Sequence, residues 1–302
     1  MQKNLKNYGF TLIEIMIAMT VLVVLTGIII GMVTQSGAKS QADLLKVKVF
    51  DGTTKNKLIN NLIGEWSLDE GSGATAVNSS DYGATLNGTI NGATYQPSSN
   101  CISNGCLSFD GNDTVSFANI SSMDISNLSA YTISVWVRAA NTANLEAALG
   151  YGSDINNNPT IVIGKASDNR AWFQNRDDAA SIMQIYSDNT IDGNWHLLTG
   201  VRYSANDHKI FVDGVLQSML GTTTIGTMTE NKAGLGVLPR AANSYLWTGS
   251  MDEVRIYGAA LAVSQIQEQY YAGLGKLLAK GEITQQEYNQ RIAALEKQTA
   301  YK

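Results

Sequence analysis

Apolar residues are concentrated near the start of the chain, where residues 10–32 form one continuous run. Glu14 is the only charged residue among these 23. A helix of this length would extend roughly 35 Å, which is enough to cross a bilayer core of about 30 Å. The run is also longer than the roughly 7–15-residue apolar region of a secretory signal peptide. We therefore predict a membrane-spanning helix over residues 10–32.

The apolar pattern continues beyond this run at helical spacing. Leu58, Ile59, Leu62 and Ile63 fall at positions i, i+1, i+4 and i+5, which lie on one stripe of a helix. This spacing predicts that the outer half of the same helix covers residues 33–63. Residues 10–63 would then form one long helix.

From Gly64 the pattern changes to short apolar or alternating runs separated by Gly, Asn, Asp and Ser. Such runs predict a sandwich of antiparallel sheets, and no long helical pattern interrupts them before residue 262. Asp213-Gly214 lies between two of the runs and is typical of a two-residue hairpin turn. The predicted strands are 107–109, 114–117, 131–137, 160–163, 171–174, 182–186, 195–202, 209–212 and 254–257.

Residues 263–302 return to a helical pattern. We predict a short helix that contains Tyr270 and ends at Gly273-Leu274-Gly275, then a second one from Leu274 that stops at Gly281. Thr284, with Glu287 three residues later, forms a capping box that starts a further helix. The sequence leaves open whether this tail packs on its own domain or on a neighbouring molecule. The expected fold class is therefore α+β: a long N-terminal helix, an all-β sandwich and short C-terminal helices.

Composition and charge exclude several classes of protein. The 302 residues include 21 Lys and Arg and 26 Asp and Glu, which gives a net charge of −5. No basic footprint of the kind that binds nucleic acid is expected from this balance. Only 16% of residues are charged, and Gly is frequent at 28 while Pro is rare at 3, which excludes collagen and disfavours disorder. Two cysteines cannot form a four-cysteine zinc site.

Glu14 needs an explanation, because a carboxylate inside an apolar segment costs a few kcal/mol near the bilayer centre. Residues 3–14, Lys-Asn-Leu-Lys-Asn-Tyr-Gly-Phe-Thr-Leu-Ile-Glu, resemble the leader of type IV prepilins. The resemblance implies that residues 1–9 are a leader and that a prepilin peptidase cuts between Gly9 and Phe10 and methylates the new amine. It also implies that Glu14 pairs with the Phe10 amine of a neighbouring subunit during assembly.

This resemblance implies partners and a location. The partners would be other pilin subunits, the pilus assembly machinery and the inner membrane before assembly. The leader would lie in the cytoplasm and the remaining domain would be exported, ending in an extracellular pilus. The count of lysines on either side of the apolar run does not by itself fix this orientation. Two alternatives stay open: a pseudopilin of a type II secretion or DNA-uptake machine, and a membrane-anchored surface protein that does not polymerise.

Six motifs in residues 64–262 resemble, in their order, the laminin-G-like, concanavalin A-like jelly roll. The resemblance implies a module that binds carbohydrate or protein, sometimes with calcium. The protein would therefore be a filament subunit that displays this domain for adhesion. The motifs are Trp66–Gly73, Leu86–Thr89, Leu107–Asp113, Tyr131–Val137, Ile210–Gly214 and Gly249–Tyr257.

Cys101 and Cys106 are expected to form a disulfide. Asn104 and Gly105 between them favour a tight turn, and an exported location permits oxidation. Two free thiols are the alternative. The disulfide would clamp the loop that enters the strand at residues 107–109.

Candidate ligand residues lie in the β-domain, although no cofactor is required. Asp113 and Asp252 fall in motifs that can host calcium, since turn carboxylates are suitable ligands for that ion. The alternative is that Asp113 shapes a turn with Asp110 and that Asp252 or its neighbour Glu253 pairs with Arg255. Aromatic rings could stack on a sugar or could belong to the core, and the ligand-binding residues themselves stay unknown. The rings considered for stacking are Trp172, Tyr186, Tyr151 and Trp247, whereas Trp136 is expected to be structural.

We do not expect an enzyme. The Glu-x-Asp-x-Glu pattern of glycosidases with this fold is absent, as are the Gly-x-Ser-x-Gly and His-Glu-x-x-His patterns. The chain has two histidines, His196 and His208, and we expect both to be packing or surface residues.

Overall fold

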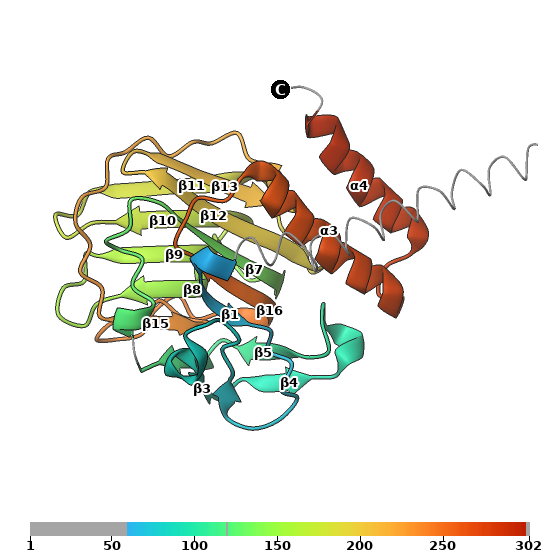
Figure 1. The fold of residues 1–302 in the computed structure, drawn as a ribbon, viewed down its shortest axis with the longest axis horizontal. Coiled ribbons are helices and arrows are strands. Elements are labelled where there is room, and N and C mark those ends of the chain that lie inside the picture. Colours follow the sequence, from blue (N-terminus) through green and yellow to red (C-terminus); the bar gives the residue numbers. More distant parts are fainter. Residues whose placement is uncertain (1–58, 119, 300–302) are drawn as a thin grey trace, which may run out of the picture. The chain divides into compact units, whose positions relative to one another are not determined.

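The computed structural model describes residues 59–118 and 120–299. In this part of the chain, two antiparallel sheets face each other and two helices lie along one side of the sandwich (Figure 1). The predicted leader and the predicted helix over residues 10–32, with Gly9, Phe10 and Glu14, lie outside the described residues, as does most of residues 33–63. Among the residues that are described, no helix is both long and apolar enough to span a membrane.

The first sheet, sheet A, has β16 near its centre. One edge of β16 pairs with β7, and its other edge pairs first with β5 and then with β1. The order is β14 (Val215–Leu216), β13 (Asp207–Val212), β12 (His196–Ser204), β7 (Tyr131–Ala139), β16 (Thr248–Tyr257), β5 (Cys106–Asp110) and β4 (Thr94–Gln96), with β1 (Leu62–Trp66) beside β16.

The second sheet, sheet B, packs against the first. The strand order of sheet B is β11 (Ile182–Thr190), β10 (Arg170–Arg176), β9 (Thr160–Lys165), β8 (Glu146–Gly152), β15 (Lys232–Leu235), β6 (Thr114–Phe117), β3 (Gly88–Asn91) and β2 (Thr75–Ala76). Outside the two sheets, short 3-10 turns occur at Ile59–Asn61, Gly83–Leu86, Ser98–Asn100 and Ile120–Ser122.

The core lies between the two sheets because alternate residues of each strand point to opposite faces. In β7, Ile133 and Val135 point into this core, whereas Trp136 points to the outer face of sheet A. The predicted antiparallel sandwich is confirmed, and all nine predicted strand runs overlap observed strands. Strand β8 was not predicted because its sequence, Glu-Ala-Ala-Leu-Gly-Tyr-Gly, contains no β-branched residue and does not alternate.

The predicted hairpin turn is also confirmed. Asp213 and Gly214 have φ values of 55° and 76°, and the residues on either side, Val212 and Val215, pair directly. Two consecutive positive φ values define a type I′ turn, whose twist matches that of the flanking strands.

The predicted end of the N-terminal helix at residue 63 is wrong. Leu62 and Ile63 belong to β1, where Leu62 pairs with Tyr257 of β16. β1 is five residues long and ends at Trp66, which is fully buried in the core. A short apolar run does not distinguish a strand from a helix by spacing, and pairing with β16 decides the outcome here.

The C-terminal tail contains two helices that pack on its own domain. α3 (Val263–Lys280) is continuous, so the predicted break at Gly273-Leu274-Gly275 is wrong. Gly273 serves close packing instead, because a Cβ at this position would lie 2.3 Å from the Trp136 ring. One turn earlier, Tyr270 stacks on the same ring with centroids 5.6 Å apart. The tail therefore covers the outer face of sheet A.

The ends of the two helices follow the predicted signals. Gly281 adopts a φ of 77° and ends α3. α4 (Gln285–Thr299) begins after Thr284, whose hydroxyl oxygen accepts a hydrogen bond from the Glu287 amide at 3.1 Å. The apolar cluster beneath the helices consists of Cys101, Ile102, Cys106, Trp136, Trp195, Leu197, Tyr270, Leu274, Leu277, Ile283, Tyr288, Ile292 and Leu295.

Gly273→Ala should destabilise the domain. In an exposed helix this change is stabilising by roughly 0.5–1 kcal/mol, but here the new methyl group would overlap a buried indole. We expect a loss of about 1–3 kcal/mol in the free energy of unfolding, measured by denaturant titration. Gly193→Ala is the matched control, because a Cβ at Gly193 has no neighbour within 4 Å. Equal stability of both variants would contradict the packing role of Gly273.

Candidate functional site

Strand β16 departs from regular pairing where the polar residues of the site begin. Asp252 pairs with Trp136 and Arg255 with Ser134, so Glu253 is part of a bulge with one extra residue. Glu253 has a φ of 48°, which is uncommon for a residue other than glycine. The bulge places the side chains of both Glu253 and Arg255 in a cleft under α3.

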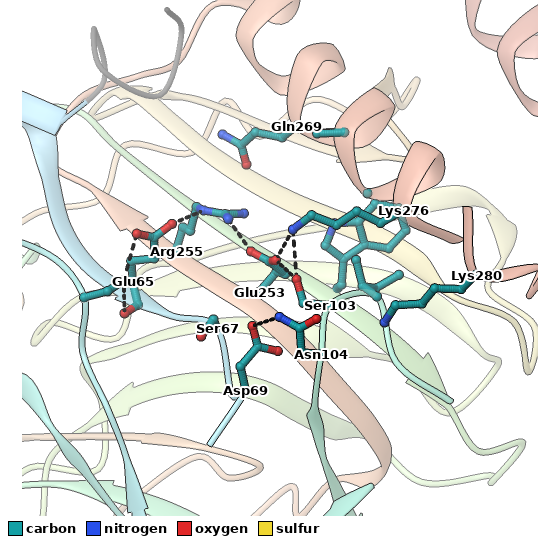
Figure 2. Close-up of a pocket in the computed structure, with 15 residues that line it drawn as sticks. Glu65, Ser67, Asp69, Ser103, Asn104, Glu253, Arg255, Gln269, Lys276 and Lys280 are labelled. Atoms are coloured by element: carbon teal, nitrogen blue, oxygen red, sulfur yellow. Dashed lines mark hydrogen bonds and ion pairs between the residues drawn. The ribbon is translucent and has the colours of Figure 1, made fainter. Parts of the chain in front are cut away.

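This polar cleft has a volume of about 420 Å³ (Figure 2). It lies between β1, β16, the loop closed by the two cysteines, and α3. Its wall includes the charged residues Glu65, Asp69, Glu253, Arg255, Lys276 and Lys280, with Ser67, Ser79, Ser103, Asn104 and Gln269 between them and Trp136 at its base.

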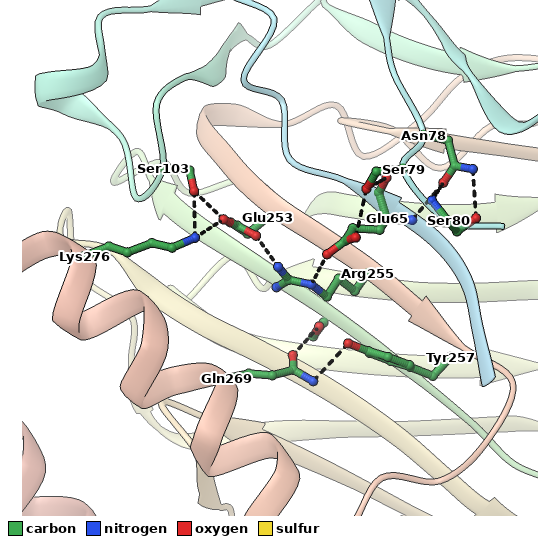
Figure 3. A network of polar contacts seen from close by, with 11 residues as sticks. Glu65, Asn78, Ser79, Ser80, Ser103, Glu253, Arg255, Tyr257, Gln269 and Lys276 are labelled. Carbon is green, nitrogen blue, oxygen red and sulfur yellow. Dashed lines mark hydrogen bonds and ion pairs between the residues drawn. The ribbon is translucent and has the colours of Figure 1, made fainter. Parts of the chain in front are cut away.

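Ion pairs connect the walls of the cleft (Figure 3). The Arg255 guanidinium donates to Glu65 Oε1 at 2.9 Å and also to Glu253 Oε2. Lys276 Nζ lies 2.5 Å from Glu253 Oε1 and donates to the Ser103 hydroxyl at 2.8 Å. Ser103 in turn donates to Glu253. One carboxylate, Glu253, therefore joins β16, the cysteine loop and α3.

The electrostatics explain why this carboxylate stays charged although it is buried. Burial alone would raise the pKa of Glu253, but Arg255 and Lys276 outweigh burial and hold that pKa well below its usual range. Burial would likewise lower the pKa of Arg255, and the carboxylates of Glu253 and Glu65 raise it instead.

Asp252 behaves in the opposite way. Its side chain is fully buried, Oδ2 accepts a hydrogen bond from the Ser103 amide at 2.9 Å, and Oδ1 has no hydrogen-bond partner among the described residues. Burial, with the neighbouring charge of Glu253, raises the pKa of Asp252 well above its usual value. Asp252 therefore favours the neutral form, which leaves three carboxylates facing three cations around the cleft.

The ion pairs and hydrogen bonds of the cleft hold β1, β16, the cysteine loop and α3 together. The Ser103 hydroxyl contacts Lys276, but the ammonium of Lys276 is paired with Glu253 and is not a free base. The Trp136 ring is 1% exposed and cannot stack on a sugar, so its predicted structural role is confirmed. The sequence did not predict that Glu65, Ser103 and Lys276 join the network around Glu253 and Arg255. These residues are far apart in the chain and come together only in the folded domain.

The predicted disulfide between Cys101 and Cys106 is confirmed. Both cysteines are fully buried, and the loop that they close carries Ser103 and Asn104 to the cleft. Lys280 of α3 donates to the carbonyl of Cys101 at 3.1 Å and to that of Ser98 at 3.0 Å. The disulfide thus fixes the loop on which α3 docks.

Asp113 and Asp252, the residues predicted as possible calcium ligands, lie in different parts of the structure. Asp113 accepts a hydrogen bond from the Asp110 amide at 2.9 Å and shapes the turn after β5, whereas Asp252 lies under the cysteine loop. Within residues 59–118 and 120–299, no group of three or more His, Cys, Asp and Glu side chains is arranged to hold a metal ion. The two structural alternatives, a turn at Asp113 and a pair between Glu253 and Arg255, describe what is observed.

Three of the four aromatic residues considered for sugar stacking cannot serve, because they are fully buried. Trp172 packs on the outer face of sheet B under Tyr245, while Tyr151 and Trp247 belong to the core. Tyr186 is half-buried on that same outer face, and the Arg170 guanidinium lies 4.8 Å from its ring centroid. Trp172 is buried although it lies on an outer face, because Leu238 and Tyr245 pack on it.

The two histidines differ in environment. His208 is fully buried, and burial together with the Arg202 charge lowers its pKa to about 4, so it is a packing residue as predicted. His196 lines a second cleft of about 240 Å³ between β12 and α4. Its ring nitrogens lie 2.8 Å from Asp213 and 3.1 Å from Asp192. Burial would lower the pKa of His196, but these carboxylates raise it above its usual value.

Two family models match the sequence. Residues 109–267 match the concanavalin A-like lectin/glucanases superfamily, and residues 4–30 match the prokaryotic N-terminal methylation motif. None of the curated proteins matches the chain.

Solved structures with the same fold include both whole domains and parts of larger chains. Domain 4 of AbnA, an extracellular arabinanase from Geobacillus stearothermophilus solved with arabinotriose, is 18% identical with a TM-score of 0.51, covering 69% of this chain and 97% of that one. The binding domain of botulinum neurotoxin serotype D is 11% identical (TM-score 0.55, 72% and 53% covered). That of Paraclostridial Mosquitocidal Protein 1 is 16% identical (TM-score 0.54, 70% and 52% covered). This chain thus spans about half of the two toxin binding domains.

Glu253→Gln should destabilise the domain strongly. The change leaves Lys276 without a carboxylate partner and Arg255 with only Glu65, and breaking a buried ion pair costs about 3–5 kcal/mol. The free energy of unfolding at pH 7 measures the effect.

Asp252→Asn is the matched control, since it makes the same chemical change at the adjacent carboxyl. The raised pKa of Asp252 means that the wild-type protein loses stability as the pH rises from about 4 toward the folded-state pKa. The Asn variant should lack this loss and be at least as stable as the wild type at pH 7. A larger loss for Asp252→Asn than for Glu253→Gln would contradict the assigned charge states.

Proposed function

Because the chain belongs to the concanavalin A-like lectin/glucanases superfamily and carries a prokaryotic N-terminal methylation motif, we propose that it is a pilin-like surface subunit. Its N-terminal segment would assemble it into a filament, and its jelly-roll domain would be displayed on the surface for attachment. The methylation motif at residues 4–30 is the observation that carries this proposal.

The proposed assembly step uses three residues. A prepilin peptidase would cut between Gly9 and Phe10 and methylate Phe10, and the mature subunit would stay in the membrane through residues 10–32 before assembly. Glu14 would then pair with the Phe10 amine of a neighbouring subunit. Two opposite charges attract strongly in an apolar filament core, and an unpaired one is costly there, so this pair would fix the position of each subunit along the filament.

The described domain is suited to display outside the cell. The Cys101–Cys106 disulfide is compatible with an oxidising location. The C-terminal helices cover the outer face of sheet A of their own domain, so the tail is not a free arm for binding neighbours. The head is therefore a self-contained unit that the N-terminal segment would carry.

Attachment is proposed on the basis of the fold and its relatives. One solved structure with this fold was determined with arabinotriose, and others are binding domains of toxins. We therefore propose a role in binding carbohydrate or protein, which rests on the fold and not on identified ligand-binding residues.

Glu14→Gln should block filament assembly without blocking export of the protein. The amide keeps the size of the side chain but removes the charge that would pair with the Phe10 amine. We expect sheared filament fractions to contain at least tenfold less of the variant, with membrane levels unchanged. These amounts are measured by quantitative immunoblotting.

Glu282→Gln is the matched control, because Glu282 is an exposed carboxylate between α3 and α4. It should assemble like the wild type. If Glu14→Gln filaments were as abundant as those of the control, Glu14 would have no role in assembly.

A further inference from the structure

The outer face of sheet B carries two arginines that have no acidic partner among the described residues. Arg176 ends β10, on the same face of the strand as Trp172 and Gln174. Arg240 follows Leu238 and Pro239, which cross this face: Leu238 packs with Trp172, and a Cβ at Gly152 of β8 would meet the Pro239 carbonyl at 2.1 Å. Both arginines thus lie over the same surface.

Neither arginine is neutralised within the described part of the chain. No side-chain hydrogen bond or ion pair joins the guanidinium of Arg176 or of Arg240 to another described residue, and Arg240 Nε is buried without a partner. Burial lowers the pKa of Arg240, the nearby Tyr245 phenol acts in the opposite direction, and the positive charge of Arg176 lowers the pKa further.

Two neighbouring arginines without an acidic partner among the described residues are unusual in so acidic a domain. The described residues include 13 Lys and Arg and 23 Asp and Glu, a net charge of 13 − 23 = −10. Two guanidiniums that repel each other, in a domain with many carboxylates available, are stabilised when an oxyanion lies between them. The planar guanidinium fork can also donate two parallel hydrogen bonds to a pair of oxygens, either those of a planar carboxylate or two of those of a tetrahedral sulfate.

The surroundings of the arginines are mixed apolar and polar. Ile182 is paired with Arg176 across the strands and is 45% exposed, which is high for an isoleucine. Gln184 and Tyr186 follow on the same face of β11 and are half-buried. Apolar patches, amides and a phenol side by side suit the alternating faces and hydroxyl groups of sugar rings.

We propose that Arg176 and Arg240 bind an acid group of an extracellular polysaccharide, a carboxylate or a sulfate ester carried on a sugar. This rests on the proposed function, because it specifies the ligand of the displayed head. The acidic remainder of the domain repels densely charged polyanions, so the ligand carries isolated acid groups between neutral parts.

Calorimetric titration of the full-length protein in detergent micelles tests the proposal. The probes are trigalacturonate, its methyl ester, a sulfated galactose oligosaccharide and a short DNA strand. We expect trigalacturonate or the sulfated oligosaccharide to bind, with an affinity that falls as salt rises. The methyl ester, which lacks the charge, should bind at least tenfold more weakly than trigalacturonate.

Variants locate the site. Arg176→Ala and Arg240→Ala should each weaken binding at least tenfold, and Arg176→Lys should restore part of it. Lys297→Ala is the matched control, because Lys297 is an exposed cation on α4, over the other sheet. It should bind like the wild type, and unchanged melting temperatures should show that all variants fold.

Three results would overturn the proposal. These are no binding of either acidic oligosaccharide, binding that the arginine substitutions leave unchanged, and DNA binding as tight as that of the sugars. Filament formation by the arginine variants separates this proposal from the proposed function. If the protein forms normal filaments but binds no acidic oligosaccharide, the ligand proposal fails and the proposed role as a filament subunit stands. If it binds the oligosaccharide but forms no filaments, the proposed filament role fails and the ligand proposal stands.

Discussion

The buried ion pair between Glu253 and Arg255 is the interaction on which the rest of the domain depends. It places a charged carboxylate on the outer face of sheet A, where water is largely excluded, and this charge is tolerated only because Lys276 and Glu65 complete the network. Those partners come from α3 and β1. The first strand, the central strand and the C-terminal helix are consequently held in one arrangement.

The packing around Trp136 completes this arrangement with apolar contacts. Gly273 allows α3 to approach the indole closely, and Tyr270 stacks on it. The disulfide fixes the loop that carries Ser103, so the helix meets a rigid surface. One face of the sandwich is therefore covered by its own tail, whereas the outer face of sheet B carries Arg176, Arg240 and the exposed Ile182. The two faces differ in what they can offer a ligand.

Local patterns in the sequence predicted the parts of the fold that depend on neighbouring residues. The strands, the Asp213-Gly214 turn, the cap at Thr284 and the disulfide were confirmed because their signals lie within a few positions of each other. Two predictions were wrong: a helix through residue 63, and a helix break at residues 273–275. Distant partners decide both regions, because Leu62 pairs with β16 and Gly273 packs against Trp136. The candidate site depends on Glu65, Ser103, Glu253 and Lys276, which meet only after folding, so spacing could not reveal it.

The proposed subunit combines a segment that would build a filament with a domain that would bind at the surface. The most direct test is the intact mass and N-terminal peptide of the protein from sheared surface filaments. We predict a chain that begins at methylated Phe10, lacks residues 1–9 and retains the Cys101–Cys106 disulfide. An uncut chain that begins at Met1 and is confined to membranes would contradict it.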